Sequence, residues 1–391
     1  MKTGLYKRSA DIYFKGMWLL TIALYIMIPL EYGFLKVVYN GIHIITVAVS
    51  LLITALPLFR GEIEVFNLKR IGLLLGICVV LIVSIMMSEE AITFDIQGVG
   101  ILGFLEMLFA IYIVDRVDHG QDKITFVFRA NLIIALIFSV LSFTSLAYTH
   151  KIEDSLNLGF SNPNETAIYL LMNFSLLLLY TFYVKKSLNK ILVYILCAYL
   201  FLLIYRTSCR TGVVAAIAVA AYTLIAPKWK IPKILIFAAM LLPFFVLFVY
   251  TELYIGGHFH DLTILGKPFY SGREEYFAEM LEALKGYWLV GDVGKNPFNN
   301  MHNGPLAILS ACGVIGYLLY LRFAGKTIRH YYRGAVSHSQ TVALVVIFSV
   351  FFHSSSEAAL VVGGSSYSIV LATFYWLLKG GDAEGGGLNG R

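Results

Sequence analysis

Apolar positions along this chain gather into long, nearly unbroken segments that short polar stretches separate. A helix of roughly 20 apolar residues crosses the hydrocarbon core of a bilayer, whereas a membrane barrel shows short alternating strands. The pattern therefore predicts an all-α polytopic membrane protein, with a single transmembrane domain over residues 1–379. We expect twelve spans, at about 16–34, 42–59, 71–88, 98–114, 129–148, 166–184, 190–205, 211–226, 233–253, 303–323, 340–356 and 359–378.

Composition agrees with a membrane protein and excludes a soluble globular one. Hydrophobic residues make up 59% of the chain and charged residues only 14%. The first apolar run follows a basic stretch and has no small-residue cleavage site, so it is expected to be a retained span and not a signal peptide. The four cysteines lie in or beside apolar runs without paired spacing, which favours neither a disulfide nor a metal cluster.

The distribution of Lys and Arg predicts the topology. With the twelve spans above, 22 of the 30 basic residues fall on the side that holds both termini, and 8 fall on the other side. The positive-inside rule then places both termini in the cytoplasm. The formal charge of +6 is thus a topology signal and not a sign of a nucleic-acid partner.

One connection, at about 254–301, is much longer than the others and is predicted to be extracytoplasmic. Ser271 to Glu274 form a capping-box pattern, which predicts an amphipathic helix at about 272–285 with Arg273 in its first turn. Its apolar positions follow at helical spacing: Phe277, Met280, Leu281 and Leu284. The tail at 380–391 is glycine-rich and polar, so we expect it to be flexible.

Arginines near the external ends of the spans are the first candidates for chemistry. Arg210 and Arg206 lie in the predicted external turn 206–212, where the charge rule predicts no cation, and Arg273 lies in the long loop. Two guanidinium groups suit a doubly charged anion such as a pyrophosphate. The alternatives are arginines that anchor helices at the headgroup level, or a solvated loop arginine among acidic neighbours.

His302 and Glu357 are the candidates for proton transfer and orientation. His302 precedes Asn303, which has the character of a helix N-cap, and a neutral imidazole can accept a proton. Glu357 lies in a short external turn without Lys or Arg, either as a loop charge or as a partner that orients His302 or an arginine. An interfacial histidine is the alternative for His302.

Polar residues in the remaining external turns have weaker implications. Asn162, Asn164 and Glu165 could hydrogen-bond sugar hydroxyls, although turn and capping chemistry also explains them. His258, His260 and Asp261 on an irregular loop are a weak metal pattern, so no metal is expected. The cytoplasmic loops carry neither a Gly-rich phosphate cradle nor an Asp-x-Asp pair, which disfavours a nucleotide or nucleotide-sugar donor, and no cofactor is expected.

Taken in order, these motifs resemble those of the O-antigen ligase/polymerase family of bacterial envelope glycosyltransferases. The motifs are Ser-x-Arg-Thr-Gly at 208–212, Ser-Gly-Arg at 271–273, His-Asn at 302–303 before a span with Gly313 and Gly316, and Asn-Pro-Asn-Glu at 162–165. The topology of about twelve spans with one large, late external loop extends the resemblance over most of the chain.

The resemblance implies a metal-independent, inverting glycosyltransferase of the polytopic GT-C type in the bacterial cytoplasmic membrane. Its donor would be a glycan on undecaprenyl pyrophosphate, presented at the outer face. By resemblance, Arg210 and Arg273 would grip the pyrophosphate and His302 would assist the acceptor hydroxyl. The implied partners are the lipid bilayer, a chain-length regulator and a flippase, with no nucleic acid.

Within the family, a polymerase of O-antigen or capsule repeat units is favoured over a ligase that transfers the finished glycan to lipid A core or another acceptor. The alternative from another class is a transporter or flippase of lipid-linked oligosaccharides, which twelve helices would also suit. A transporter should show several mid-span charges or two related halves. Glu106 is the clearest mid-span acid, and no internal repeat is visible.

Overall fold

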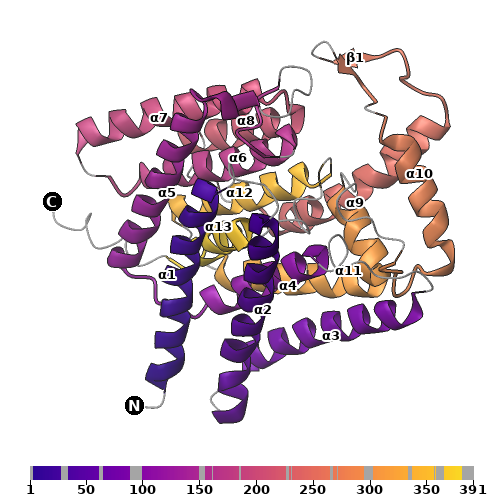
Figure 1. Ribbon diagram of the computed structural model, residues 1–391, viewed down its shortest axis with the longest axis horizontal. Helices are drawn as coiled ribbons and strands as arrows, with labels where there is room; N and C mark the ends of the chain where they lie inside the picture. Colours follow the sequence, from indigo (N-terminus) through magenta and orange to yellow (C-terminus); the bar gives the residue numbers. More distant parts are fainter. Residues whose placement is uncertain are drawn as a thin grey trace.

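A computed structural model of the chain describes residues 3–27, 34–60, 65–88, 99–148, 155–160, 162–184, 186–225, 229, 231–264, 267–270, 272–294, 303–332, 337–355, 357 and 365–380. The described residues are helical apart from turns and one pair of two-residue antiparallel strands. Figure 1 shows the helices packed together, with α10 and β1 at the right edge and α5 and α7 at the left.

The described residues form thirteen α-helices, two short 3-10 helices and the strand pair. The α-helices are α1 (Thr3–Met27), α2 (Phe34–Arg60), α3 (Val65–Met87), α4 (Val99–Val114), α5 (Gln121–Leu141), α6 (Pro163–Tyr180), α7 (Ser187–Arg206), α8 (Arg210–Ile225), α9 (Lys233–Ile255), α10 (Glu274–Ala283), α11 (Gly304–Tyr331), α12 (His338–His353) and α13 (Ser365–Leu377). The other elements are η3 (Ser145–Tyr148), η4 (Leu284–Gly286), β1 (Thr263–Ile264) and β2 (Lys267–Pro268).

Apolar helices of membrane-spanning character confirm the predicted class. Among the described residues, six helices are long and apolar enough to cross a bilayer: α1, α3, α5, α7, α9 and α11. Five shorter apolar helices accompany them, namely α2, α4, α8, α12 and α13. The protein is thus all-α and polytopic in architecture, while twelve spans and their orientation stay predictions.

Several helices begin well before the apolar windows that predicted them, α1 and α5 among them. α1 starts at Thr3 and not near 16, and α5 starts at Gln121 and not near 129. Ion pairs stabilise the added turns of both helices. Asp11 pairs with Lys15 one turn along α1 (3.3 Å) and with Lys123 of α5 (2.7 Å). An apolar window detects the part of a helix that suits lipid, and a helix can continue beyond it.

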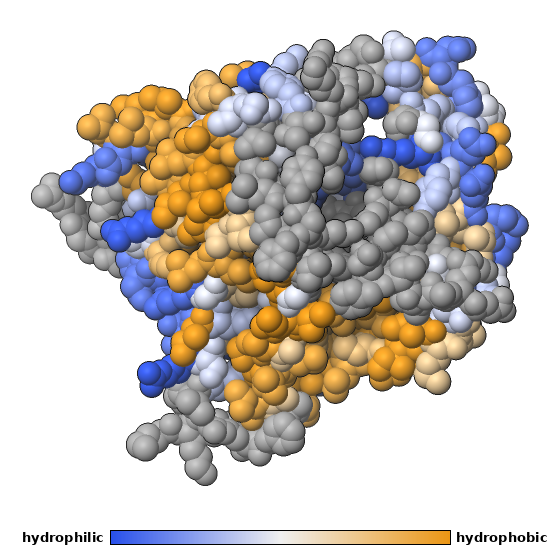
Figure 2. Space-filling model, in the orientation of Figure 1, coloured by the Kyte–Doolittle hydropathy of each residue, from blue (hydrophilic) through white to orange (hydrophobic). Residues whose placement is uncertain are grey.

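The centre of the bundle is made by α4, α6 and α13. Most side chains of α6 are buried, and α13 packs along α1 and α4. Large apolar side chains of α3 and α7 instead point outward, among them Leu75, Val79, Ile82, Ile191 and Ile195. Figure 2 shows the resulting hydrophobic surface over the upper left and along the bottom, with hydrophilic residues at the left and right edges. Apolar faces turned outward are expected of helices that meet lipid.

Contacts between connections divide the bundle into two ends. At the termini end, Lys7 pairs with Asp118, and Gln340 at the start of α12 donates to the carbonyl of Leu378 beyond α13. At the loop end, the Arg210 guanidinium donates to the carbonyl of Pro268, and the Gly304 amide to that of Ser354. Connections that the sequence assigns to one side of the membrane thus lie at the same end.

α11 is broken inside the bundle, and the segment after α10 fills the break. Cys312 and Gly313 leave the helical conformation, with Gly313 at a φ of 60°. The amides of Val314 and Ile315 then donate to the carbonyls of Trp288 and Leu289 (2.8 and 3.2 Å). In return the Asp292 amide donates to the Ser310 carbonyl (2.8 Å). The backbone groups at the break therefore form hydrogen bonds with segment 287–294 in place of those within the helix. Buried backbone groups need such partners.

Candidate functional site

Four helices begin around one short segment at the loop end. The segment, 353–357, begins at the last residue of α12 and is described except at position 356, and the helices are α6, α8, α10 and α11. The amide group of Asn303, the N-cap of α11, donates to the Ser355 carbonyl (2.8 Å), and the Gly304 amide donates to the Ser354 carbonyl (2.7 Å). The first turn of a helix presents free amides and partial positive charge. The arrangement concentrates such charge around segment 353–357.

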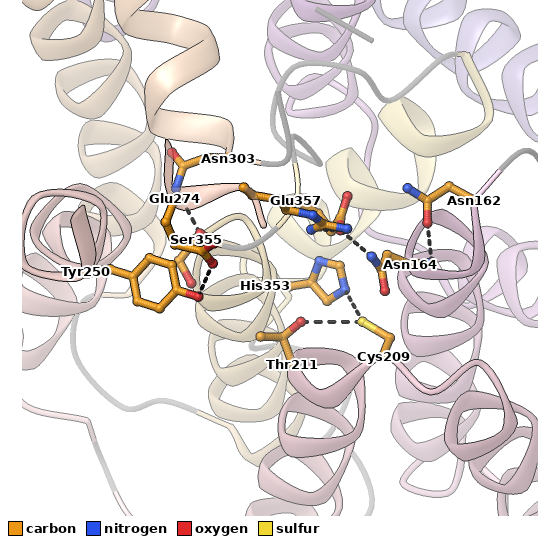
Figure 3. A network of polar contacts seen from close by, with 11 residues as sticks. Asn162, Asn164, Cys209, Thr211, Tyr250, Glu274, Asn303, His353, Ser355 and Glu357 are labelled. Carbon is orange, nitrogen blue, oxygen red and sulfur yellow. Dashed lines mark hydrogen bonds and ion pairs between the residues drawn. The ribbon is translucent and has the colours of Figure 1, made fainter. Parts of the chain in front are cut away.

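An ion pair and an amide meet at Glu357 (Figure 3). Its Oε1 accepts from Nη1 of Arg273, the N-cap of α10 (2.9 Å), and from Nδ2 of Asn164, in the first turn of α6 (2.5 Å). The Arg273 side chain is 27% exposed and that of Glu357 12% exposed. One carboxylate oxygen therefore joins the starts of two helices while the arginine keeps an open side.

His353 lies directly beside this pair, between Glu357 and the turn that precedes α8 (Figure 3). Its Nε2 is 3.6 Å from the Cys209 sulfur, which also lies 3.4 Å from the hydroxyl of Thr211. Both His353 and Cys209 are buried. Burial raises the pKa of the Cys209 thiol to about 11, so the thiol is neutral at physiological pH and is a poor nucleophile.

A second carboxylate at the start of α10, that of Glu274, contacts α9. Glu274 is buried and accepts from the hydroxyl of Tyr250 in the last turns of α9 (2.5 Å). The same hydroxyl lies 3.2 Å from the Phe269 carbonyl, next to Pro268, whose carbonyl accepts from Arg210 (3.1 Å). These contacts tie the long loop to α9 and α8 on the Arg210 side of the site.

Close packing brings α8 against α6. A Cβ on Gly212 would lie 3.1 Å from the Cβ of Ala167 and 3.4 Å from the Cys209 sulfur. Ser208 has a φ of 58°, so the chain reverses between α7 and α8 within the three residues 207–209. The predicted turn at 206–212 is therefore too long, because α7 extends to Arg206 and α8 already begins at Arg210.

Of the predicted site residues, four meet at segment 353–357: Asn164, Arg273, Asn303 and Glu357. Arg210 lies at the edge of this group and contacts the loop through Pro268. Arg206 instead stacks over the ring of Tyr148, 5.4 Å from its centroid, and bonds to its hydroxyl. His302 lies outside the described residues.

The α6 residues differ in what they contribute. Asn162 is the N-cap of α6, and its side chain accepts from the Asn164 amide (2.9 Å), which is the capping role. Glu165 is half-buried in the first turn of α6. The Asn164 side chain donates to Glu357, so this member of the Asn-Pro-Asn-Glu motif contacts the arginine network.

The capping-box prediction at 271–274 is wrong. Helix α10 begins at Glu274 with Arg273 as its N-cap, and no side chain caps it through a hydrogen bond. The N-cap position falls at Arg273 and not at Ser271, and the Glu274 carboxylate accepts from Tyr250 of α9. Arg273 consequently lies just before the first turn and points toward Glu357.

The sequence interpretation missed His353, Cys209, Tyr250 and Glu274. His353 ends a long apolar run and lies one helical turn before Glu357, a signal that could have paired the two. Tyr250 and Glu274 are far apart in sequence, and nothing in either segment predicts their contact. Among the described residues, no group of three or more His, Cys, Asp or Glu could hold a metal ion.

Comparisons with protein-family models, with curated proteins and with solved structures each return no match.

Proposed function

We propose that the protein is a membrane glycosyltransferase that takes its glycan from a polyprenyl-pyrophosphate carrier. The observation that supports it best is the partly exposed Arg273, held by Glu357 among four helix starts. A guanidinium has five N–H donors in a planar fork, and the Arg273 side chain is 27% exposed, so Arg273 offers a phosphate a partly accessible cation that Glu357 holds in place. Arg210 at the neighbouring helix start would supply the second cation.

The chemistry requires little beyond charge and a base. The acceptor hydroxyl oxygen attacks the anomeric carbon, the bond from that carbon to the phosphate oxygen breaks, and the pyrophosphate leaves with the electron pair. Cations held in place stabilise the charge that builds on the leaving group. The acceptor proton passes to a base, for which His302 is our candidate, because Glu357 is engaged in orienting Arg273.

The orientation belongs to the same proposal. The loop end would face outward, in the cytoplasmic membrane of a bacterium, with both termini inside. Cysteines placed at Lys267 and at Lys326 of an otherwise cysteine-free protein test it with a membrane-impermeant maleimide. Labelling of position 267 alone in intact cells is expected; labelling of position 326 from outside contradicts the orientation and removes the site from the donor's face.

The deciding experiment is reconstitution. Purified protein in liposomes, given a lipid-linked repeat unit, should produce a ladder of longer lipid-linked glycans, measured by mass spectrometry. The ladder should persist in a chelator. A single transfer that occurs only when lipid A core is added identifies the ligase instead. Absence of any product with active, folded protein contradicts the transferase proposal.

A transporter of lipid-linked oligosaccharides is the second candidate, and one buried pair favours it. Nδ1 of His43 lies 2.8 Å from Oε2 of Glu106, and both side chains are almost fully buried between α2 and α4. Ionisable groups inside membrane proteins commonly serve transport or proton transfer. The same liposomes decide: passage of labelled donor to the inner leaflet without product supports transport.

A further inference from the structure

The seam between α3 and α11 runs antiparallel from the loop end to the termini end. A Cβ on Gly76 would lie 3.2 Å from Cδ1 of Leu319, so these two positions face each other. Toward the termini end, the Arg70 guanidinium stacks on Phe323, 5.0 Å from the ring centroid. Lys69 and Arg322, the chain neighbours of that stacked pair, are therefore at the same level of the seam.

Three cations gather at this level: Lys69, Arg322 and Lys326. Arg322 and Lys326 are four residues apart on α11 and so share a face, and the charges of Lys69 and Arg322 both act on Lys326. Lys69 and Arg322 are exposed and Lys326 is half-buried. Within the described part of the chain, no carboxylate forms an ion pair with any of the three. Arg70 next to them differs, because Asp115 neutralises it.

Such a cluster has a cost that an anion relieves. Like charges four residues apart on a helix destabilise it, and a third cation adds to the repulsion. Beside the cations, the seam exposes large apolar side chains, Leu68 and Leu318, so a ligand that presents an anionic group and an acyl chain together matches it. Anionic phospholipids have this chemistry, and basic pockets between membrane helices bind their headgroups.

We propose that Lys69, Arg322 and Lys326 form a binding site for the phosphate headgroup of an anionic phospholipid. The site lies at the termini end, opposite segment 353–357, and does not depend on the proposed glycosyl transfer. The guanidinium of Arg322 would bind the phosphate oxygens, and the two ammonium groups would add charge. Leu68 and Leu318 would contact the acyl chains.

Native mass spectrometry of the full-length protein tests the proposal with phosphatidylglycerol, phosphatidylcholine and inorganic phosphate as probes. The variant is Lys69→Gln/Arg322→Gln/Lys326→Gln. Its matched control, Arg129→Gln/Lys186→Gln/Lys190→Gln, removes one arginine and two lysines with the same exposure pattern at the same end. Thermal unfolding confirms that both proteins fold, and Lys69→Gln/Lys326→Gln serves as a milder second variant.

We expect phosphatidylglycerol affinity to fall by about tenfold or more in the triple variant and by less in the double variant, since each basic residue contributes severalfold. The control should keep nearly wild-type affinity, and phosphatidylcholine should bind weakly to all. Equal losses in variant and control mean diffuse surface charge and overturn the site. Binding of inorganic phosphate as strongly as phosphatidylglycerol overturns its assignment to a lipid.

Discussion

Two arginine–carboxylate pairs occupy the two ends of the bundle, and their settings differ. Arg70 and Asp115 at the termini end are 2.5 Å apart, with exposures of 0% and 5%. The Arg70 guanidinium also lies against Tyr112 and Phe323 (5.2 and 5.0 Å to the ring centroids). Arg273 and Glu357 at the loop end are 2.9 Å apart and remain 27% and 12% exposed.

The difference separates a structural pair from a candidate site. Rings and helix backbone surround Arg70, so it has no room for a further anion, and removing its partner leaves a buried charge. Arg273 lies on a helix start in the long loop, where a ligand can approach it from the open side. Charge at the first pair should therefore determine stability, and charge at the second should determine function.

The largest effect should follow from breaking the enclosed pair. Asp115→Ala should destabilise the fold by about 3–5 kcal/mol, because the Arg70 charge stays buried without its partner. Glu357→Gln should lower stability by about 1 kcal/mol at most, since that pair is partly solvated. Thermal unfolding in detergent measures both. Equal losses of stability in the two variants would contradict the distinction between the ends.

Glycan transfer, unlike stability, should depend most on the Arg273–Glu357 pair at the loop end. Arg273→Ala should lower glycan transfer by about 10²–10³-fold with little change in unfolding temperature, as for loss of one donor to a developing anion. Arg210→Ala should act in the same direction, and Arg273→Lys should restore part of the rate, since a point charge replaces a planar fork.

The control for the arginines is Lys285→Ala in the same loop, whose side chain is 67% exposed and paired with Glu282. It should keep the wild-type rate. Wild-type turnover in both arginine-to-alanine variants would return Arg210 and Arg273 to an anchoring role.

Helix caps at the two ends offer a finer comparison. Asn303 caps α11 by accepting from the Leu306 amide (2.9 Å), and Ser337 caps α12 by accepting from the Gln340 amide (3.3 Å). Replacing either with Ala should cost about 1 kcal/mol of stability. Only Asn303→Ala should also slow transfer, because Asn303 holds segment 353–357 through Ser355. Similar rates in the two variants would show that Asn303 is a cap alone.

The last comparison concerns pH. The buried Cys209 thiol has its pKa raised to about 11, whereas an unfolded thiol ionises near roughly 8.5. The unfolded state therefore loses its proton first, and stability should fall as pH rises from about 8.5 to 11. Cys209→Ala should remove that decline. Iodoacetamide should modify Cys209 slowly at pH 8, compared with a cysteine introduced by Lys285→Cys; equal rates would contradict its burial.

Much of the fold could be predicted from hydropathy, because lipid and core both select apolar helices. The run at 98–114 is α4, Val99–Val114, almost to the residue. The starts of α1 and α5 could not be predicted in this way, since ion pairs extend them beyond the apolar windows. The break in α11 was also not predicted. Gly313 is visible in the sequence, but the segment that pairs with the break lies twenty or so residues earlier.

The site was predictable where local chemistry determines a residue's place. Asn303 before Gly-Pro is the N-cap of α11, as expected from capping preference. Contacts between distant segments were not predictable. The bond between Asn164 and Glu357 joins residues 193 positions apart, and a single sequence holds no signal for that distance. Tyr250 was missed for the same reason, whereas His353 lies only one helical turn before Glu357 and could have been paired with it.

The docking of segment 287–294 at the α11 break limits which substitutions this chain can accept during evolution. A Cβ on Gly291 would lie 2.5 Å from the Ser310 carbonyl oxygen, and one on Gly313 would lie 2.3 Å from that of Leu289. Both obstacles are main-chain atoms, so no change of rotamer can relieve them. Neither glycine can mutate alone while the segments stay docked. Natural relatives of this chain should hold glycine at both positions, or should have lost both together with the docked segment, and the pair should be inherited as one trait.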